Sequence, residues 1–591
     1  MKNIVNYVVL VCVALGMASC VQDLNTKPID PNSSTSFNQE RMFTKCYACM
    51  AVIGQSGPGE DSDVEDIDAG MSGFYRTIWY CNDLTTDEAF WIWDDAESRG
   101  LPTTNWTGSS DMIRGIYTRL NINIKYCNHY LTYASSDTDE DKNRIAEVRW
   151  IRAFHYFYLM DLFFYAPFVT EDSNEYPHFI PRHQLYSWLV AELEDLAIEL
   201  PDRNQKYRVD KSAAQLLLAR IYLNADVYNK YRSGWTQNSA ESKAEFAKAE
   251  KFADRLINDG IHSLVTTDVT TDSNFVYSAY QRLFMGDNNR DDIMKEAIFQ
   301  IYQDGLYTQS HAGSKFLICG PRIGAMTAWG IEDEWHALRT SPTLIDKFLA
   351  PVYKDRNTAQ TMVYNEYEMP TQLKDKRAIF CSDGENTAEH KNFTLTGWTK
   401  DDGTGYGKNE FFYRSWAGVK FTGVYSTASM PKYHERQSAG WPDTDIPMMR
   451  LAEAYLIRGE AKARQSGVWE DAHADIKVLR DRAGAPDLKS PITEVDVLDE
   501  WCREFWFEGR RRMDLVRFGR FFGAEADLNQ YHWEGRKGMR DDEAFVTGTP
   551  EYMNWFPIPF EDKRSNPNFK TDVEEDASNT FRALGGDGYQ Y

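Results

Sequence analysis

The stretch Glu504–Arg520, EFWFEGRRRMDLVRFGR, mixes eight charged residues with large apolar ones. Read as one helix, it has a narrow apolar stripe that would face the core. That stripe is Cys502, Trp506, Gly509, Met513 and Val516. In a second stripe Glu508 and Arg512, four residues apart, interrupt apolar side chains. A charged pair among apolar side chains is costly to bury unless it is well bonded, so it indicates either a catalytic site or an internal ion pair.

Composition and charge bound the class of protein. The 591 residues are 42% hydrophobic and 14% aromatic, which is typical of a folded chain with a large core. The formal net charge is −24, and no Lys/Arg-rich block concentrates positive charge locally. Because phosphate binding needs a basic face, we expect no nucleic-acid partner.

The nine cysteines do not form a disulfide framework, since two lie in the first 20 residues and the others are scattered. Cys46 and Cys49 have the C-x-x-C spacing, but a zinc site would need a second pair. We interpret them as two small buried thiols on one helical turn, and we expect neither a metal nor a cofactor.

The N-terminus has the features of a bacterial lipoprotein signal. Lys2 precedes the apolar run Tyr7–Met17, which is too short to span a bilayer as a mature helix. The sequence Met17-Ala-Ser-Cys20 resembles a lipobox, so residues 1–19 are predicted to be the signal peptide and Cys20 the acylated first residue. Residues 20–36 are then a polar tether, and more than one acyl chain, palmitate among them, would hold the protein at the membrane. The alternative is an ordinary secreted protein with a coincidental cysteine.

The segment Asp83–Asn105 is rich in aromatic residues without helical periodicity. Large rings in a polar loop suggest that a ligand docks on them. A sugar ring presents an apolar C–H face that Trp or Tyr covers, while polar side chains bond its hydroxyl groups. By this rule the first candidate ligand-binding residues are Asp87, Trp91, Trp93, Asn105 and Trp106.

A second candidate loop, Tyr307–Trp335, contains several glycines and aromatic residues. Its candidate ligand-binding residues are Tyr307, Arg322, Trp329 and Trp335. With 17 Trp and 33 Tyr in the chain, most aromatic residues must belong to the core, which is the alternative for each single ring.

Helical spacing of apolar residues dominates elsewhere. Helices are predicted at Glu40–Val52, Ser109–Tyr133, Asp141–Phe164, Gln184–Leu200, Lys211–Tyr228, Ser242–Asn258, Asp445–Arg464 and Ala472–Arg482. A capping box at Thr493 and Asp496 is predicted to start the helix that carries the opening stretch. The fold class is mostly α: pairs of TPR-like helices around 109–260 and 445–520, with a loop-rich part around 261–440.

Several segments in the right order resemble the SusD-like (RagB/SusD) family of outer-membrane nutrient-binding lipoproteins. They are Glu147–Thr170, Ala213–Leu264, Asp445–Ala463, Leu479–Pro486, Glu504–Gly519 and Phe556–Asn568. The resemblance implies one SusD-like domain over residues 37–591, with a TPR-like superhelix and an irregular subdomain. It also implies a surface lipoprotein of the outer membrane that binds an oligosaccharide and delivers it to a SusC-like TonB-dependent transporter, without catalysis.

The family places the opening stretch in the helical scaffold, so Glu508 and Arg512 are expected to form an internal ion pair. A peptide ligand is the alternative within the same scaffold. From a different class, a surface glycoside hydrolase would need two carboxylates facing each other across a cleft. With 89 acidic residues such pairs can always be chosen, but none lies in a recognisable motif, and G-x-S-x-G, the P-loop and H-E-x-x-H are absent from the sequence.

Overall fold

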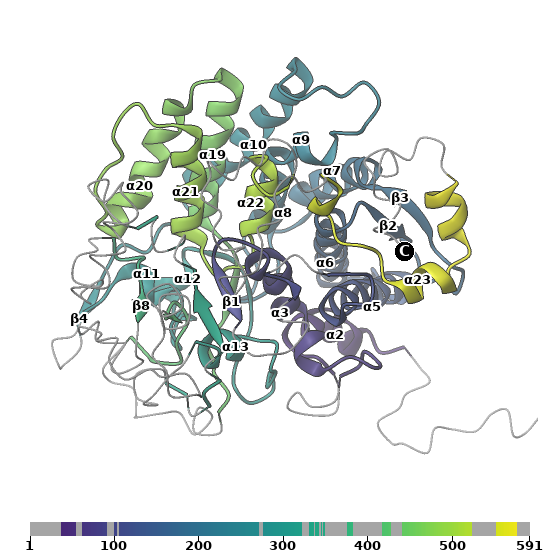
Figure 1. Cartoon of the computed structure of the whole chain (residues 1–591). Helices are drawn as coiled ribbons and strands as arrows, with labels where there is room; N and C mark the ends of the chain where they lie inside the picture. Colours follow the sequence, from purple (N-terminus) through teal and green to yellow (C-terminus); the bar gives the residue numbers. More distant parts are fainter. Residues whose placement is uncertain are drawn as a thin grey trace, which may run out of the picture.

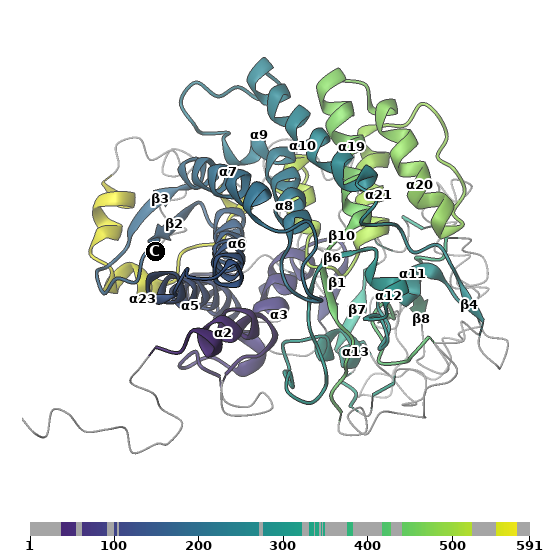
Figure 2. The ribbon, with the colours of Figure 1, turned by 180° about the vertical axis from the view of Figure 1, so that it is seen from behind.

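The computed structural model describes residues 37–54, 62–91, 100–102, 106–270, 276–321, 330–331, 333–335, 337–341, 344, 347–348, 375–381, 417–426, 440–522 and 551–575. Long helices pack side by side through one half of the molecule, and short strands and loops fill the other half (Figures 1 and 2). The predicted mostly α fold class is confirmed.

The first group of predicted helices is confirmed within two residues at most ends. The helices are α2 (Gln39–Ala51), α5 (Asp111–Tyr133), α6 (Asp139–Leu162), α7 (Arg182–Glu199), α8 (Lys211–Leu223), α9 (Ala225–Tyr228) and α10 (Ala240–Asn258). The predicted helix 211–228 is broken at Asn224, whose side-chain amide donates to the Arg220 carbonyl. The helices pack in sequence, α5 on α6, α6 on α7, α7 on α8 and α8 on α10.

The C-terminal group continues this series, because α10 packs on α19 and α19 on α20. Its elements are β10 (Ile446–Arg450), α19 (Leu451–Ser466), α20 (His473–Ala483), α21 (Glu494–Phe505) and α22 (Arg511–Arg517). The prediction of helix from residue 445 is wrong for the first six residues, because Ile446–Arg450 form a strand paired with β6 (Ala297–Ile301) and the helix begins at Leu451. The capping box at Thr493 and Asp496 is confirmed.

The remaining elements are short. The strands pair antiparallel as two-stranded sheets: β1 (Ala89–Trp91) with β7 (Leu338–Thr340), β2 (Tyr165–Phe168) with β3 (His178–Pro181), β4 (Val269–Thr270) with β5 (Val276–Tyr277), and β8 (Phe380–Cys381) with β9 (Ala417–Gly418). The other helical pieces are α3 (Phe74–Trp79), α11 (Ala279–Arg282), α12 (Asp291–Met294), α13 (Lys315–Cys319), α23 (Phe560–Ser565), three 3-10 turns, and the π-helical turns η3 (Tyr80–Leu84) and η10 (Lys570–Glu574).

The opening stretch is not one helix. Helix α21 ends at Phe505, and α22 begins only at Arg511. Between them Phe507 and Gly509 adopt left-handed backbone, with φ of 61° and 73°. For a residue with a side chain this conformation costs about 1–3 kcal/mol and persists only where the surroundings enforce it. Both sides of the segment are buried, so the two stripes of the helical reading do not separate core from solvent.

Two carboxylates from the first hundred residues enforce this turn. Asp83 accepts hydrogen bonds from the backbone N–H groups of Gly509, Arg510 and Arg511 at 2.7, 2.9 and 3.2 Å. Glu88 accepts from the N–H of Phe507 at 2.9 Å. The helix-starting N–H groups of α22, which have no helical acceptor, are satisfied in this way.

The expected ion pair between Glu508 and Arg512 is wrong. Arg512 donates to the side chain and carbonyl of Asp161, in α6. Glu508 accepts from Lys420 at 2.6 Å and from Arg450 at 2.7 Å. The break in the helix separates the two side chains, and each finds a partner far away in the sequence.

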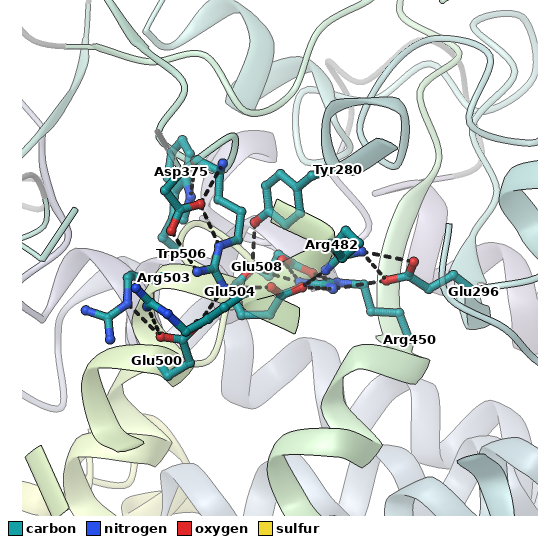
Figure 3. A network of polar contacts seen from close by, with 12 residues as sticks. Tyr280, Glu296, Asp375, Arg450, Arg482, Glu500, Arg503, Glu504, Trp506 and Glu508 are labelled. Carbon is teal, nitrogen blue, oxygen red and sulfur yellow. Dashed lines mark hydrogen bonds and ion pairs between the residues drawn. The ribbon is translucent and has the colours of Figure 1, made fainter. Parts of the chain in front are cut away.

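Glu504 is the hub of a buried charge network (Figure 3). Its carboxylate accepts from Arg450 at 2.6 Å, from Arg377 at 3.0 Å and from Arg482. Burial alone would raise the pKa of Glu504, but the guanidinium groups of Arg482, Arg450 and Arg377 outweigh it and hold the pKa far below the usual value. Its backbone carbonyl accepts from the Tyr280 hydroxyl at 2.5 Å.

This network is a strut rather than a site. A cavity of about 20 Å³ next to Arg450, Glu508 and Arg510 leaves room for about one water molecule and for no substrate. Arg377 lies close to β8, Arg450 ends β10, Arg482 lies in α20 and Glu504 in α21, so the hub joins the loop-rich part to the helices.

Three further findings concern the described part of the chain. None of its helices is both long and apolar enough to cross a bilayer. Cys46 and Cys49 are free and buried, as interpreted. No cluster of three or more His, Cys, Asp or Glu side chains within these residues is arranged to hold a metal ion.

Replacing Glu504 tests directly whether the buried charge network stabilises the fold. Glu504→Ala leaves three buried guanidinium groups without their common acceptor, and we expect the free energy of unfolding to fall by about 3–5 kcal/mol in urea titrations. Lys477→Ala removes an exposed ion pair with Asp481 and serves as the control, which should unfold like the wild type. Equal stability of the two variants would contradict the strut.

The turn should also make stability depend on pH. Burial raises the pKa of Asp83 to about 7, and burial followed by the charge of Asp83 raises the pKa of Glu88, so the folded chain holds protons there that the unfolded chain releases near pH 4. Stability from Asp83 is present at low pH and is lost as pH rises toward 7. Between pH 5.5 and 8, the unfolding free energy of the wild type should fall by about 1–2 kcal/mol more than that of Asp83→Asn. The histidines titrate in both proteins, so their contribution cancels in this comparison. Parallel pH curves for the two proteins would show that Asp83 is already ionised at pH 5.5.

Candidate functional site

The second aromatic loop begins in a tight turn that pushes one ring into solvent. Asp304 accepts from the backbone N–H groups of Leu306, Tyr307 and Thr308 at 2.9, 2.7 and 3.1 Å. Burial alone would raise the pKa of Asp304, but these donors outweigh it and lower the pKa. The carboxylate thus fixes the turn, and Tyr307 is left 83% exposed.

Downstream of this turn three rings form a partly exposed surface, which we call the aromatic face: His311, Trp335 and Trp441. The His311 ring lies 6.1 Å from Trp335 and 5.0 Å from Trp441, centroid to centroid. Helix α13 holds the backbone of Trp335, whose N–H donates to the Cys319 carbonyl at 2.9 Å. Helix α13 and strand β1 lie close together in both ribbon views (Figures 1 and 2).

Arg76, from α3, supports the aromatic face from behind. Its guanidinium carbon is 5.3 Å from the Trp335 ring centroid and 5.5 Å from that of Trp91, and it donates to the His311 carbonyl at 3.3 Å. Its Nε donates to the Tyr80 hydroxyl at 2.6 Å. A cation over an aromatic ring is attracted by about 0.5–2 kcal/mol, more where it is desolvated, so Arg76 fixes the position of Trp335.

Charged groups border the aromatic face. Lys315 lies 3.7 Å over the Trp441 ring and forms an ion pair with Asp333 at 2.5 Å. Gly440 has φ of 77°, and a Cβ there would lie 3.2 Å from the Asp333 carboxylate, so a glycine lets the two segments approach closely. Burial, followed by the charges of Lys315 and Arg76, lowers the pKa of His311.

This arrangement suits stacking against a flat apolar ligand surface with hydrogen bonds around it. A neutral imidazole both donates and accepts, and the Asp333 carboxylate accepts from hydroxyl groups. Rings paired with such a rim meet the requirement for sugar binding.

Three of the residues predicted from the first loop lie in the core. Asp87 is fully buried, and its carboxylate accepts from Arg511 at 2.8 and 2.9 Å and pairs with Lys347 at 3.2 Å. Trp91 is 1% and Trp106 4% exposed. Trp106 packs on Phe522 and Phe556. These three side chains therefore present no surface to a ligand in this conformation.

The structure brings the two predicted loops together at one point. Strand β1 pairs with β7, and the Trp91 ring lies 6.5 Å from Trp335. Among the predicted residues that the structure describes, Trp335 and Tyr307 have exposed surface. The predicted residues Trp93, Asn105, Arg322 and Trp329 lie outside the described residues.

Sequence reasoning missed Arg76, His311, Lys315, Asp333 and Trp441. His311 and Lys315 lie inside the predicted loop, but neither type of side chain is distinctive there. Trp441 is about a hundred residues away, beyond the predicted loop, and Arg76 lies in a buried helix. Its contact with Trp335 could not be found without the fold.

Comparison with curated proteins gives a relative along nearly the whole chain. The Starch-binding protein SusD of Bacteroides thetaiotaomicron is 34% identical over 583 residues, covering 96% of this chain and 98% of the relative. A sequence model of the SusD family matches residues 295–574.

Solved structures share the fold at lower sequence identity. One, a complex with a xylogluco-oligosaccharide, has a TM-score of 0.63 at 16% identity and covers 90% of this chain and 97% of its own. Surface glycan-binding protein A of Bacteroides thetaiotaomicron in complex with laminarihexaose has a TM-score of 0.57 at 15% identity, with the same coverage. A SusD-like carbohydrate-binding protein of Bacteroides fragilis has a TM-score of 0.62 at 18% identity, covering 90% and 98%. The fold and the similarity along the chain lead to one conclusion: this protein belongs to the SusD family.

Proposed function

We propose that this chain binds a starch-type glucan at its aromatic face and passes it to a SusC-like TonB-dependent transporter of the outer membrane, without cleaving it. The observation that carries the proposal is the set of partly exposed rings His311, Trp335 and Trp441 with Arg76 behind them and Asp333 at the edge. The relative at 34% identity is a starch-binding protein, which supports an α-glucan.

Binding rather than catalysis fits the construction of the molecule. The buried charge network around Glu504 has no exposed carboxylate, and the cavity beside its members Arg450 and Glu508 holds about one water molecule. At the aromatic face the Asp333 carboxylate already forms an ion pair with Lys315. Glycoside hydrolysis requires a proton-donating carboxyl group and a second carboxylate on opposite sides of the bond, and an ion-paired carboxylate is poorly suited to donate a proton.

Calorimetric titration with maltoheptaose tests the binding proposal. Because stacking on an exposed ring supplies much of the affinity for a sugar, Trp335→Ala should weaken binding at least about tenfold while the thermal midpoint is retained. Tyr133→Ala removes a ring 55% exposed on α5 and is the matched control, which should bind like the wild type.

Unchanged affinity of a folded Trp335→Ala protein would remove the aromatic face from consideration. Binding of peptide mixtures in place of oligosaccharides would favour the peptide alternative. Release of reducing ends from starch would favour the hydrolase.

Lipid attachment at Cys20 is the proposed means of holding the protein at the membrane. Cys20→Ser removes the acylation site, and we expect the protein to move from the membrane fraction to the soluble fraction, since a polar tether alone gives no hydrophobic anchor. Cys12→Ser changes a cysteine inside the predicted leader and should leave the distribution unchanged. A membrane-bound Cys20→Ser protein would contradict the anchor.

A further inference from the structure

A pocket of about 260 Å³ lies apart from the aromatic face, between the loop that joins α7 to α8 and the strand β6. We call it the Tyr207 pocket. It is lined by residues 203–208, Asp210, Asp291, Met294 and residues 297–300. Helices α8 and α12 both pack against β6, so the walls of the pocket belong to the rigid part of the fold (Figure 2).

Two tyrosine rings meet at the edge of the pocket. Tyr207 has left-handed backbone, with φ of 68°, which is uncommon for a residue with a large side chain. Its ring lies 4.6 Å from that of Tyr302, centroid to centroid. Tyr302 is 39% exposed, and Tyr207 is partly exposed. The Tyr207 ring lies at the mouth of the pocket although its backbone conformation is unfavourable. Such a conformation persists only where the surrounding structure enforces it.

Polar groups in the wall offer both acceptors and donors. Gln300 is 5% exposed, and its Oε1 accepts no hydrogen bond. Gln300 and Tyr302 are two residues apart. In an extended chain, side chains two residues apart point to the same side. Arg203 and Lys206 supply N–H donors, and both have exposed side chains. A buried amide oxygen without a donor costs about 1–3 kcal/mol, so a ligand that donates to it is favoured.

We propose that the Tyr207 pocket is a second carbohydrate subsite, where a sugar residue stacks on Tyr207 and Tyr302 and its hydroxyl groups bond Gln300, Arg203 and Lys206. This proposal rests on the function proposed above. Hydroxyl groups donate to the amide oxygen and accept from the cations at the same time, whereas a fully deprotonated anion such as sulfate only accepts and would leave Gln300 unsatisfied.

The chain itself connects the two sites. Strand β6 ends at Ile301, Tyr302 follows it, and the next residues lead through the exposed Tyr307 to His311 of the aromatic face. Tyr302 and His311 are nine residues apart, which is at most about 30 Å of extended chain, a distance that a long glucan can span. Linked contacts raise the affinity for a polymer without raising that for a short oligomer.

Electrophoresis through gels containing soluble starch, paired with calorimetry on maltotriose, tests the second subsite. Tyr207→Gly removes the ring and keeps the left-handed backbone. We expect the dissociation constant for starch to rise at least about fivefold in this variant, which is a small part of the affinity that two linked binding sites can add. The affinity for maltotriose should change less than about twofold, because a short oligomer does not reach both sites. Tyr302→Ala should behave alike, and Tyr207→Phe, which keeps the ring, should match the wild type.

The outcomes separate this subsite from the proposed function. If the wild type is retarded by starch and folded Tyr207→Gly and Tyr302→Ala proteins are retarded equally, the subsite is wrong and the aromatic face stands. If starch does not retard the wild type, the proposed function fails, and the subsite fails with it. Loss of the Tyr207-dependent retardation on adding inorganic phosphate at constant ionic strength would make the pocket an anion site and overturn the proposal.

Discussion

The carboxylate of Glu504 lies in the core, where a charge is tolerated only if it is paired and hydrogen-bonded. Its partners come from sequence positions 22, 54 and 127 residues away. Displacing any of these segments would break charge-assisted hydrogen bonds inside the core. The same logic applies around it, where Glu508 binds Lys420 and Arg450, so the loop-rich part is held to the helices by charge as well as by apolar packing.

This constraint explains how irregular loops can carry a binding surface. The clamp of Asp83 and Glu88 on the turn before α22 fixes the segment that continues into β1. Strand β1 places Trp91 beneath Trp335, and Arg76 lies against both rings. Trp335, the ring proposed to contact the ligand, is therefore positioned by a buried ring, a buried cation and a sheet pair, so it would lose little conformational freedom on binding.

Periodic patterns were readable from the sequence, and long-range pairing was not. Helices such as α5 and α10 follow from apolar spacing, and the capping box at Thr493 predicted the start of α21. The same spacing wrongly predicted a continuous helix through Glu508. The helix is broken there because Glu88 and Asp83, more than four hundred residues away in the sequence, accept the hydrogen bonds of the backbone N–H groups. Local pairing four residues apart was the only partner that the sequence could suggest for Arg512.

The candidate site shows the same division. Aromatic loops were recognisable as places where ligands dock, yet burial separates Trp91 and Trp106 from Trp335, and no local signal distinguishes them. Arg76 and Trp441 join the face only through the fold.

The most direct test of binding without cleavage at the aromatic face is a crystal structure of the protein with maltoheptaose. We expect a glucose ring stacked on Trp335, with the glycosidic bonds of the bound sugar intact. A ligand bound on a face away from His311, Trp335 and Trp441, or found only as cleaved product, would contradict it.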